Sequence, residues 1–304
     1  MLLAKLLAFL RLSRPVFLLG GLVLYALGAL VARYEGYPIE WGAYLVGQLF
    51  VTSLQLMTHY LNEYWDMEAD QLNQTRTFFS GGSGVLSGGE LPRETALHAA
   101  FVCMAVNSAS AIVLIFQYQA GPAVWAVMLL AFLGAFFYST PPLQLSNTGY
   151  GELTTSIIVA GFVPAFAHLL QTGRPSFLIL LTTAPLVVFH YAMLLAFEFP
   201  DFLSDEAAGK KTVLVRLGRR YGARLHNALI VSALLLTAIN SFLGLPPRVA
   251  ISVAITAPLA LWQVISVHNL QRGEPVPFRR LTFGAVALFA LTAYFIAFSF
   301  WVIG

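Results

Sequence analysis

Long apolar segments, each close to the length of a membrane-spanning helix, limit most strongly how this chain can fold. The hydrocarbon core of a bilayer is about 30 Å thick, so a helix needs about 20 mostly apolar residues to cross it. Nine such segments, separated by clusters of glycine, proline and charge, can be placed at 15–33, 42–61, 95–117, 121–138, 152–170, 176–198, 226–244, 248–267 and 280–302. The sequence therefore predicts nine spans.

Composition supports a membrane protein. Hydrophobic residues make up 58% of the chain and charged residues only 10%, whereas ordinary soluble domains carry about 25% charged residues. This balance excludes disordered, fibrous and nucleic-acid-binding classes. No series of alternating strands is visible, and backbone groups in lipid must be paired internally, so the spans are expected to be helices. We predict an all-α integral membrane protein that forms a single domain over residues 1–304.

The single cysteine, Cys103, excludes an internal disulfide. No small-residue cleavage site follows Lys5, Arg11 and Arg14, so we expect the first helix to be retained.

The basic residues indicate the orientation of the spans. With the N-terminus inside, 14 Lys and Arg residues fall on the inner side and three, Arg33, Arg174 and Arg248, on the outer side. The positive-inside rule then predicts a cytoplasmic N-terminus and an external C-terminus.

Two acidic motifs follow the second and sixth predicted spans. In each motif two Asp residues lie four positions apart, and Asp201 and Asp205 follow Asp66 and Asp70 by 135 residues. Four spans separate the motifs, so both are expected at the cytoplasmic side, as in two four-helix repeats followed by a ninth helix. On a helix, residues i and i+4 share a face, and paired carboxylates there favour a hard cation such as Mg²⁺.

Basic residues and glycines follow each motif. Arg76 and a glycine-rich stretch at 80–89 come after the first motif, and Lys210 and Lys211 come after the second. Carboxylate-bound Mg²⁺ opposite Lys and Arg is suited to a diphosphate. A diphosphate beside an apolar bundle indicates a lipid tail. The order of the glycines differs from that of a nucleotide-binding loop, so we interpret the stretch as a mobile cap.

Other functions remain open at this point. A cation-coupled transporter could use acidic pairs, although transporters tend to place ion sites near the midplane on interrupted helices. A lipid-binding protein without catalytic activity is a further alternative.

His59 and His190 are expected to be hydrogen-bonded interior residues, and Tyr138 is either a ligand contact or an interfacial anchor.

Several motifs resemble those of the UbiA superfamily of intramembrane prenyltransferases. The spacing of Asn62, Asp66 and Asp70 resembles the first Asp-rich motif of that family, and 201–205 followed by the stretch 207–218 resembles the second. The resemblance also covers Arg14-Pro15, Tyr138-Ser139-Thr140-Pro141-Pro142 and Gly149-Tyr150-Gly151-Glu152. It extends over most of the chain, and nine spans is the number typical of the family.

The resemblance implies transfer of a polyprenyl group from its diphosphate to an aromatic acceptor, with Mg²⁺ as cofactor. It implies that Asp66, Asp70, Asp201 and Asp205 are the catalytic metal ligands. Substrate-binding roles fall to seven further residues, which are Arg14, Asn62, Arg76, Tyr138, Glu198, Lys210 and Lys211. The expected partners are a polyprenyl diphosphate, an aromatic acceptor and the lipid bilayer, and the expected location is a bacterial or archaeal cell membrane, with the cavity open to the cytoplasmic side.

The acceptor is indicated by the loop motifs. The Ser-Thr-Pro-Pro-Leu run and Gly-Tyr-Gly-Glu most resemble the menaquinone branch, which prenylates 1,4-dihydroxy-2-naphthoate. The chain departs from the family pattern at Glu63, where Asp is usual, at Gln144, where Lys is common, and at Glu198, where Asn is frequent. Acceptors of the 4-hydroxybenzoate, tetrapyrrole or glycerol phosphate type therefore stay open.

Overall fold

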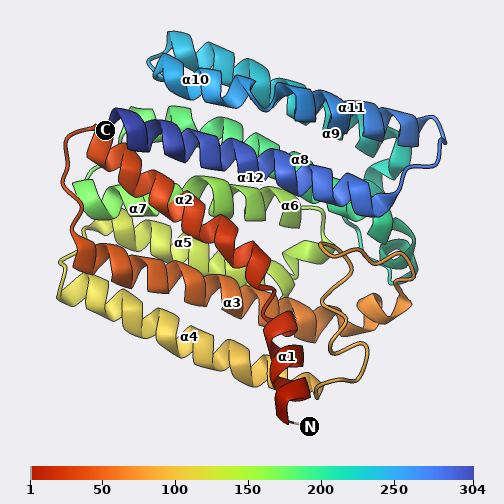
Figure 1. The fold of residues 1–304 in the computed structure, drawn as a ribbon. Helices are drawn as coiled ribbons and strands as arrows, with labels where there is room; N and C mark the ends of the chain where they lie inside the picture. The colour runs from red at the N-terminus through yellow and green to blue at the C-terminus, as the bar shows by residue number, and fades with distance from the viewer. Residues whose placement is uncertain (1) are drawn as a thin grey trace.

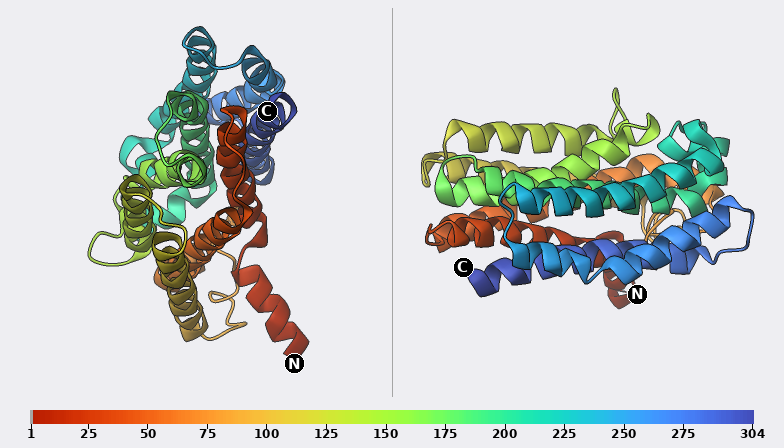
Figure 2. Two further views of the ribbon diagram at one scale, coloured as in Figure 1. Left: turned by 90° about the vertical axis from the view of Figure 1, so that its left-hand side faces the viewer. Right: turned by 90° about the horizontal axis from the view of Figure 1, so that it is seen from above.

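The computed structural model describes residues 2–304, and every regular element in that range is a helix (Figure 1). Most of the long helices run roughly side by side, so that Figure 2 shows them nearly end-on in its left view. The elements are α1 (Leu2–Leu12), α2 (Pro15–Tyr34), α3 (Trp41–Leu72), α4 (Arg93–Phe116), α5 (Pro122–Ser139), η1 (Leu145–Asn147), α6 (Gly151–Ser156), η2 (Ile157–Phe162), α7 (Val163–Thr172), α8 (Phe177–Ala207), α9 (Val213–Phe242), α10 (Pro247–Ala254), α11 (Ala257–Gln271) and α12 (Phe278–Ile303).

Helices α3 and α8 are the longest elements and carry the two acidic motifs at their C-terminal ends. They contain 32 and 31 residues, or roughly 47 Å of helix at about 1.5 Å per residue. Side-chain caps define their starts, because Glu40 accepts hydrogen bonds from the backbone N–H groups of Gly42 and Ala43, and Ser176 accepts one from Leu178. Each helix is longer than a bilayer core of about 30 Å, so its acidic end can extend beyond the hydrocarbon.

The number of membrane-crossing helices is confirmed only in part. Within residues 2–304, seven helices are long and apolar enough to cross a membrane, or eight if α10 and α11, which are bent by 43°, form one broken span. The expected span at 42–61 lies inside α3, which is not among them. Polar side chains such as Gln48, Gln55 and Thr58 reduce its hydropathy. Nine spans therefore stay a prediction.

One of the expected continuous spans is interrupted. The span at 248–267 consists of α10 and α11, and Pro258 at the second position of α11 cannot donate a backbone hydrogen bond to the preceding turn. The span at 152–170 is found as the continuous segment Gly151–Thr172, in which a π-helical stretch, η2, lies between α6 and α7. Such π-helical segments are often found at functional sites.

The C-terminus lies at one end of the bundle, whereas α1 projects from the side of the bundle (Figure 1). Close to α1, Ser13 shares a hydrogen bond of 2.6 Å with Tyr60, near the acidic end of α3. The C-terminal Gly304 packs against Tyr34, at the far end of α2. This arrangement agrees with an odd number of crossings, and the sidedness in the membrane stays a prediction.

Close approach of α2 and α7 depends on a glycine. Gly28 faces the backbone carbonyl of Pro164, and a Cβ atom at this position would overlap that carbonyl. The two backbones can therefore pack directly against each other, as small residues allow between helices in membranes.

Candidate functional site

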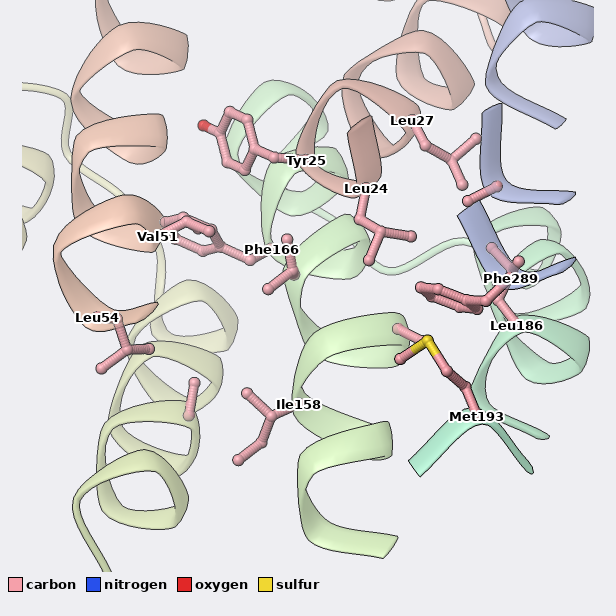
Figure 3. Close-up of a cluster of buried hydrophobic side chains, with 14 of the residues drawn as sticks. Leu24, Tyr25, Leu27, Val51, Leu54, Ile158, Phe166, Leu186, Met193 and Phe289 are labelled. Atoms are coloured by element: carbon pink, nitrogen blue, oxygen red, sulfur yellow. The ribbon is translucent and has the colours of Figure 1, made fainter. Parts of the chain in front are cut away.

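A cavity of about 470 Å³ lies between the helices, with an apolar wall along its length and polar residues at the acidic ends of α3 and α8. Its apolar wall includes Val51 and Leu54 of α3, Ile158 of η2, Met193 of α8 and Phe289 of α12 (Figure 3). Its polar end is lined by both acidic motifs and by residues of the adjoining loops. A cavity with these two parts suits a ligand with a charged head and an apolar tail.

The first motif is held by hydrogen bonds to its own helix and to α5. The side-chain amide of Asn62 donates to Asp66 Oδ2 at 2.7 Å and to Ser139 Oγ at 3.1 Å. Asp66 is 9% exposed, and Asp70 lies one turn later on the same helix. Because Asn62, Asp66 and Asp70 are each four residues apart, all three point into the cavity, which they line.

The loop after α3 brings the second motif to the first. Asn73 donates to Asp201 Oδ1 at 2.7 Å, and the hydroxyl of Thr75 contacts the carbonyl oxygen of Pro200. Asp201 and Asp205 line the same cavity as Asp66 and Asp70. Four aspartates that are far apart in the sequence therefore lie around one space, as their spacing predicts.

Lys210 connects the two motifs directly. Its Nζ lies 3.1 Å from Asp66 Oδ2 and 3.7 Å from Asp205 Oδ1. Burial acts to lower the pKa of Lys210, but the charges of Asp66 and Asp205 outweigh burial and raise this pKa above its ordinary value. Lys210 is therefore a permanent cation between the helices.

Asp70 lies beside other negatively charged groups. Burial, followed by the charges of Asp66 and Glu63, raises the pKa of Asp70 from 3.8 to about 7, although Arg14 and Lys210 act in the opposite direction. Gly82 has a positive φ of 71°, and a Cβ atom there would overlap Asp70 Oδ2. The glycine thus lets the 80–89 loop approach this carboxylate closely.

Glu63 joins the N-terminal segment to the glycine-rich loop. Arg14 Nε lies 3.3 Å from Glu63 Oε1, which also accepts the backbone N–H of Ser83 at 2.6 Å. The Ser83 hydroxyl donates to Glu63 Oε2 at 2.7 Å. Because Glu63 is 3% exposed, this network places Arg14 and the loop at the polar end of the cavity. Mobility of the loop stays a prediction.

Glu198 and Tyr138 line the cavity beyond the aspartates. The backbone N–H of Leu214 donates to Glu198 Oε2 at 2.6 Å, which ties α8 to the start of α9. His59 and His190 are hydrogen-bonded to Ser13 O at 3.2 Å and to Ser156 Oγ at 3.0 Å. The prediction of hydrogen-bonded interior histidines is confirmed, and both side chains also line the cavity.

Two residues that the family resemblance assigns to the diphosphate lie away from this cavity. Arg76 donates to the backbone oxygen of Asp70 at 2.8 Å and to Ser87 Oγ at 2.9 Å, and it lines a smaller hollow beside the loop. Lys211 is exposed, and its backbone N–H donates to Asn147 O at 2.9 Å. The structure therefore brings Arg14 and Lys210, but neither of these two, to the cavity.

Some residues in or next to the cavity were not assigned a role from the sequence. Asn73 follows the first motif by three residues and contacts Asp201, and Ser139 contacts Asn62. Glu152 lies in the Gly-Tyr-Gly-Glu motif and lines the cavity. That motif provided a signal for Glu152, whereas the contacts of Asn73 and Ser139 depend on how separate elements meet.

The donor set at the polar end suits a divalent metal. Within residues 2–304, no three His, Cys, Asp or Glu side chains converge closely enough to form a ready metal site. Carboxylates from both motifs nevertheless approach one cation, the ammonium group of Lys210. Carboxylate oxygens are the ligands that Mg²⁺ favours, so the residues present fit the metal that the sequence predicts.

Comparison with known sequences gives a consistent result. Residues 21–284 match the model of the UbiA prenyltransferase family. The chain is 23% identical over 213 residues to 1,4-dihydroxy-2-naphthoate octaprenyltransferase of Bacillus subtilis, covering 69% of this chain and 66% of that protein. It is 29% identical over 168 residues to 2-carboxy-1,4-naphthoquinone phytyltransferase of Synechocystis sp., covering 54% of each. The matched part therefore spans just under two thirds of the length of the Bacillus subtilis protein and about half of the length of the Synechocystis protein.

Solved structures share the fold. A UbiA homolog from Archaeoglobus fulgidus bound to GPP and Mg²⁺ superposes with a TM-score of 0.66 at 17% identity, covering 97% of this chain and 99% of that one. The apo structure of a UbiA homolog from Aeropyrum pernix K1 gives a TM-score of 0.68 at 18% identity, covering 92% and 96%.

Proposed function

Because the chain belongs to the UbiA prenyltransferase family, we propose that it is an integral membrane enzyme that transfers a polyprenyl group from its diphosphate to an aromatic acceptor. The observation that carries this proposal is that both Asp pairs and Lys210 lie at the polar end of one apolar cavity. The proposed acceptor is 1,4-dihydroxy-2-naphthoate, as in menaquinone biosynthesis. The names of the two curated relatives support a naphthalene-type acceptor.

The residues of the cavity have distinct parts in the proposed reaction. Asp66, Asp70, Asp201 and Asp205 would hold Mg²⁺, which when bound supplies positive charge to the diphosphate oxygens. Lys210 and Arg14 add cationic groups that bind and orient the same diphosphate. The apolar wall holds the prenyl tail and excludes water from the allylic carbon, so that the acceptor rather than water attacks it.

The position of the diphosphate follows from the cost of burying charge. Moving an anion into hydrocarbon is expensive unless it is paired. The diphosphate is therefore proposed to stay beside the aspartates while the tail extends along Val51, Leu54 and Ile158. The Lys210 ammonium between the two acidic motifs supports an anionic ligand over a cation-coupled transport site.

The decisive experiment is product identification. Purified protein is incubated with Mg²⁺, a set of prenyl diphosphates of different length and a set of aromatic acceptors, and the products are identified by mass spectrometry. A prenylated naphthoate-derived product would support the full proposal. Prenylation of another acceptor alone would exclude the proposed acceptor, and no prenylated product from any pair would exclude the function.

Removal of divalent metal is expected to abolish prenyl transfer. Without Mg²⁺ the four carboxylates would repel a diphosphate, because Lys210 and Arg14 cannot balance its charge as well as theirs. Turnover should disappear in EDTA and return when Mg²⁺ is added in excess. Undiminished turnover in the chelator would contradict a metal role for the two motifs.

We also propose that the acidic end of the bundle faces the cytoplasm, with the C-terminus outside. Cysteines at Gln74 and Glu274, two exposed loop positions, should react with a membrane-impermeant thiol reagent only from the cytoplasmic side in a Cys103→Ala background. A cysteine at Arg174, which is also exposed, should react only from outside. Labelling of positions 74 and 174 from the same side would require a different number of spans between them.

A further inference from the structure

Two buried glutamates on different helices meet in the wall of the cavity. Glu152 of α6 is 8% exposed and Glu198 of α8 is 7% exposed, and both line the cavity. The two carboxyl groups lie close enough for a hydrogen bond between them. Two ionised carboxylates have only acceptor oxygens, so such a bond would need a proton.

The unpartnered atoms of the two residues support the same interpretation. Glu152 Oε2 and Glu198 Oε1 are buried and have no hydrogen-bond partner among the described residues, although the Thr212 hydroxyl lies near the Glu198 carboxyl group. The other oxygen of Glu198 accepts the backbone N–H of Leu214 at 2.6 Å. One proton held between the carboxyl groups removes the cost of leaving these oxygens without a partner.

This pair lacks the neighbouring cations that Asp66, Asp205 and Glu63 have. Lys210 approaches Asp66 and Asp205, and Arg14 approaches Glu63. In the described part of the chain, no ion pair within 4.0 Å involves Glu152 or Glu198. Two neighbouring buried carboxyl groups without a cation hold one proton rather than ionising together. The pair is therefore placed to take up a proton from a ligand in the cavity.

We propose that the Glu152–Glu198 pair is the general base that takes the hydroxyl proton of the aromatic acceptor. This inference rests on the proposed function, to which it adds the group that activates the acceptor. It also assigns the acceptor ring to the part of the cavity beside Tyr138, which lines the cavity together with Asp66, Glu152 and Glu198. The ring would then lie near both the proposed metal ligands and the proposed base.

The proposed step is balanced in atoms and charge. A ring carbon of the acceptor forms a bond to the allylic carbon of the donor, and the bond from that carbon to the diphosphate oxygen breaks with its electron pair leaving on the diphosphate. The acceptor hydroxyl loses its proton to the glutamate pair, and the electrons of its O–H bond form a ring carbonyl. The pair gains this proton, which lowers the negative charge buried in the wall of the cavity.

Isosteric substitutions test this role. Glu152→Gln and Glu198→Gln keep a hydrogen-bonded pair, because an amide N–H replaces the shared proton, but remove a carboxylate that can accept a proton. We expect each substitution to lower the transfer rate by about 10²-fold or more, while affinity for a non-reactive prenyl thiolodiphosphate with Mg²⁺ is retained. The matched control is Glu94→Gln, an exposed position at the start of α4, which should behave as the wild type.

A series of acceptors separates a base from a structural group. The rate ratio of wild type to Glu152→Gln should shrink for acceptors with electron-withdrawing substituents whose hydroxyl is already ionised in the assay, because these need no base. Wild-type transfer rates in both variants would overturn the inference. The same rate ratio for every acceptor, together with weakened donor-analogue binding, would also overturn it. No transfer by the wild-type protein to any acceptor would instead contradict the proposed function itself.

Discussion

Replacing Asp66 or Asp201 by Ala is expected to lower the turnover number for prenyl transfer by about 10²- to 10³-fold or more. Each residue belongs to one of the two motifs that the loop after α3 joins, through the bond from Asn73 to Asp201. Loss of either carboxylate removes a proposed ligand of the cation that stabilises the departing diphosphate. The measurement is steady-state turnover of the purified variants with saturating donor and acceptor.

The control for this prediction is Glu68→Ala. Glu68 lies on the same helix between Asp66 and Asp70, but its side chain is 84% exposed and it does not line the cavity. Its loss should leave turnover close to that of the wild type, because an exposed charge beyond the cavity is screened by solvent. Folded Asp66→Ala and Asp201→Ala proteins with wild-type turnover would show that the motifs are structural.

Lys210→Met is expected to lower turnover by about 10²-fold or more, because it removes a proposed cationic contact to the diphosphate. The same change leaves Asp66 and Asp205 facing each other without the ammonium group that now joins them. Excess Mg²⁺ should restore part of the lost stability but not the full turnover. Thermal unfolding in detergent and steady-state kinetics measure the two effects separately.

Lys211→Met tests whether both lysines act on the diphosphate, as the family resemblance implies, or only Lys210, as its position in the structure indicates. The family resemblance assigns a diphosphate role to both lysines, whereas only Lys210 reaches the cavity. We expect turnover of Lys211→Met to stay within about tenfold of the wild type, a difference of no more than about 1.4 kcal/mol in activation free energy. Equal losses in the two variants would mean that Lys211 moves to the diphosphate when substrate binds.

Membrane character and the location of the acidic site could be predicted from the sequence because both depend on local patterns. Long apolar runs identify helices wherever they occur, and the i, i+4 spacing of Asp66 and Asp70 places them on one face regardless of their surroundings. The limits of this approach appear in α3, where polar residues such as Gln48 and Gln55 reduce the hydropathy of an expected span. They also appear in α10 and α11, where an apolar run that contains Pro258 predicts one continuous span, whereas the two helices are bent by 43°.

The sequence by itself determined an all-helical membrane protein with two equivalent acidic helix ends, because helix length and side-chain periodicity are properties of neighbouring residues. Only the tertiary structure decided which of the two adjacent lysines enters the cavity, which loop residue contacts Asp201, and that Glu152 meets Glu198. These contacts join residues that lie from 46 to 144 positions apart in the chain. Their formation depends on how α3, α6 and α8 pack and on where the connecting loops turn, and no local pattern encodes those distances.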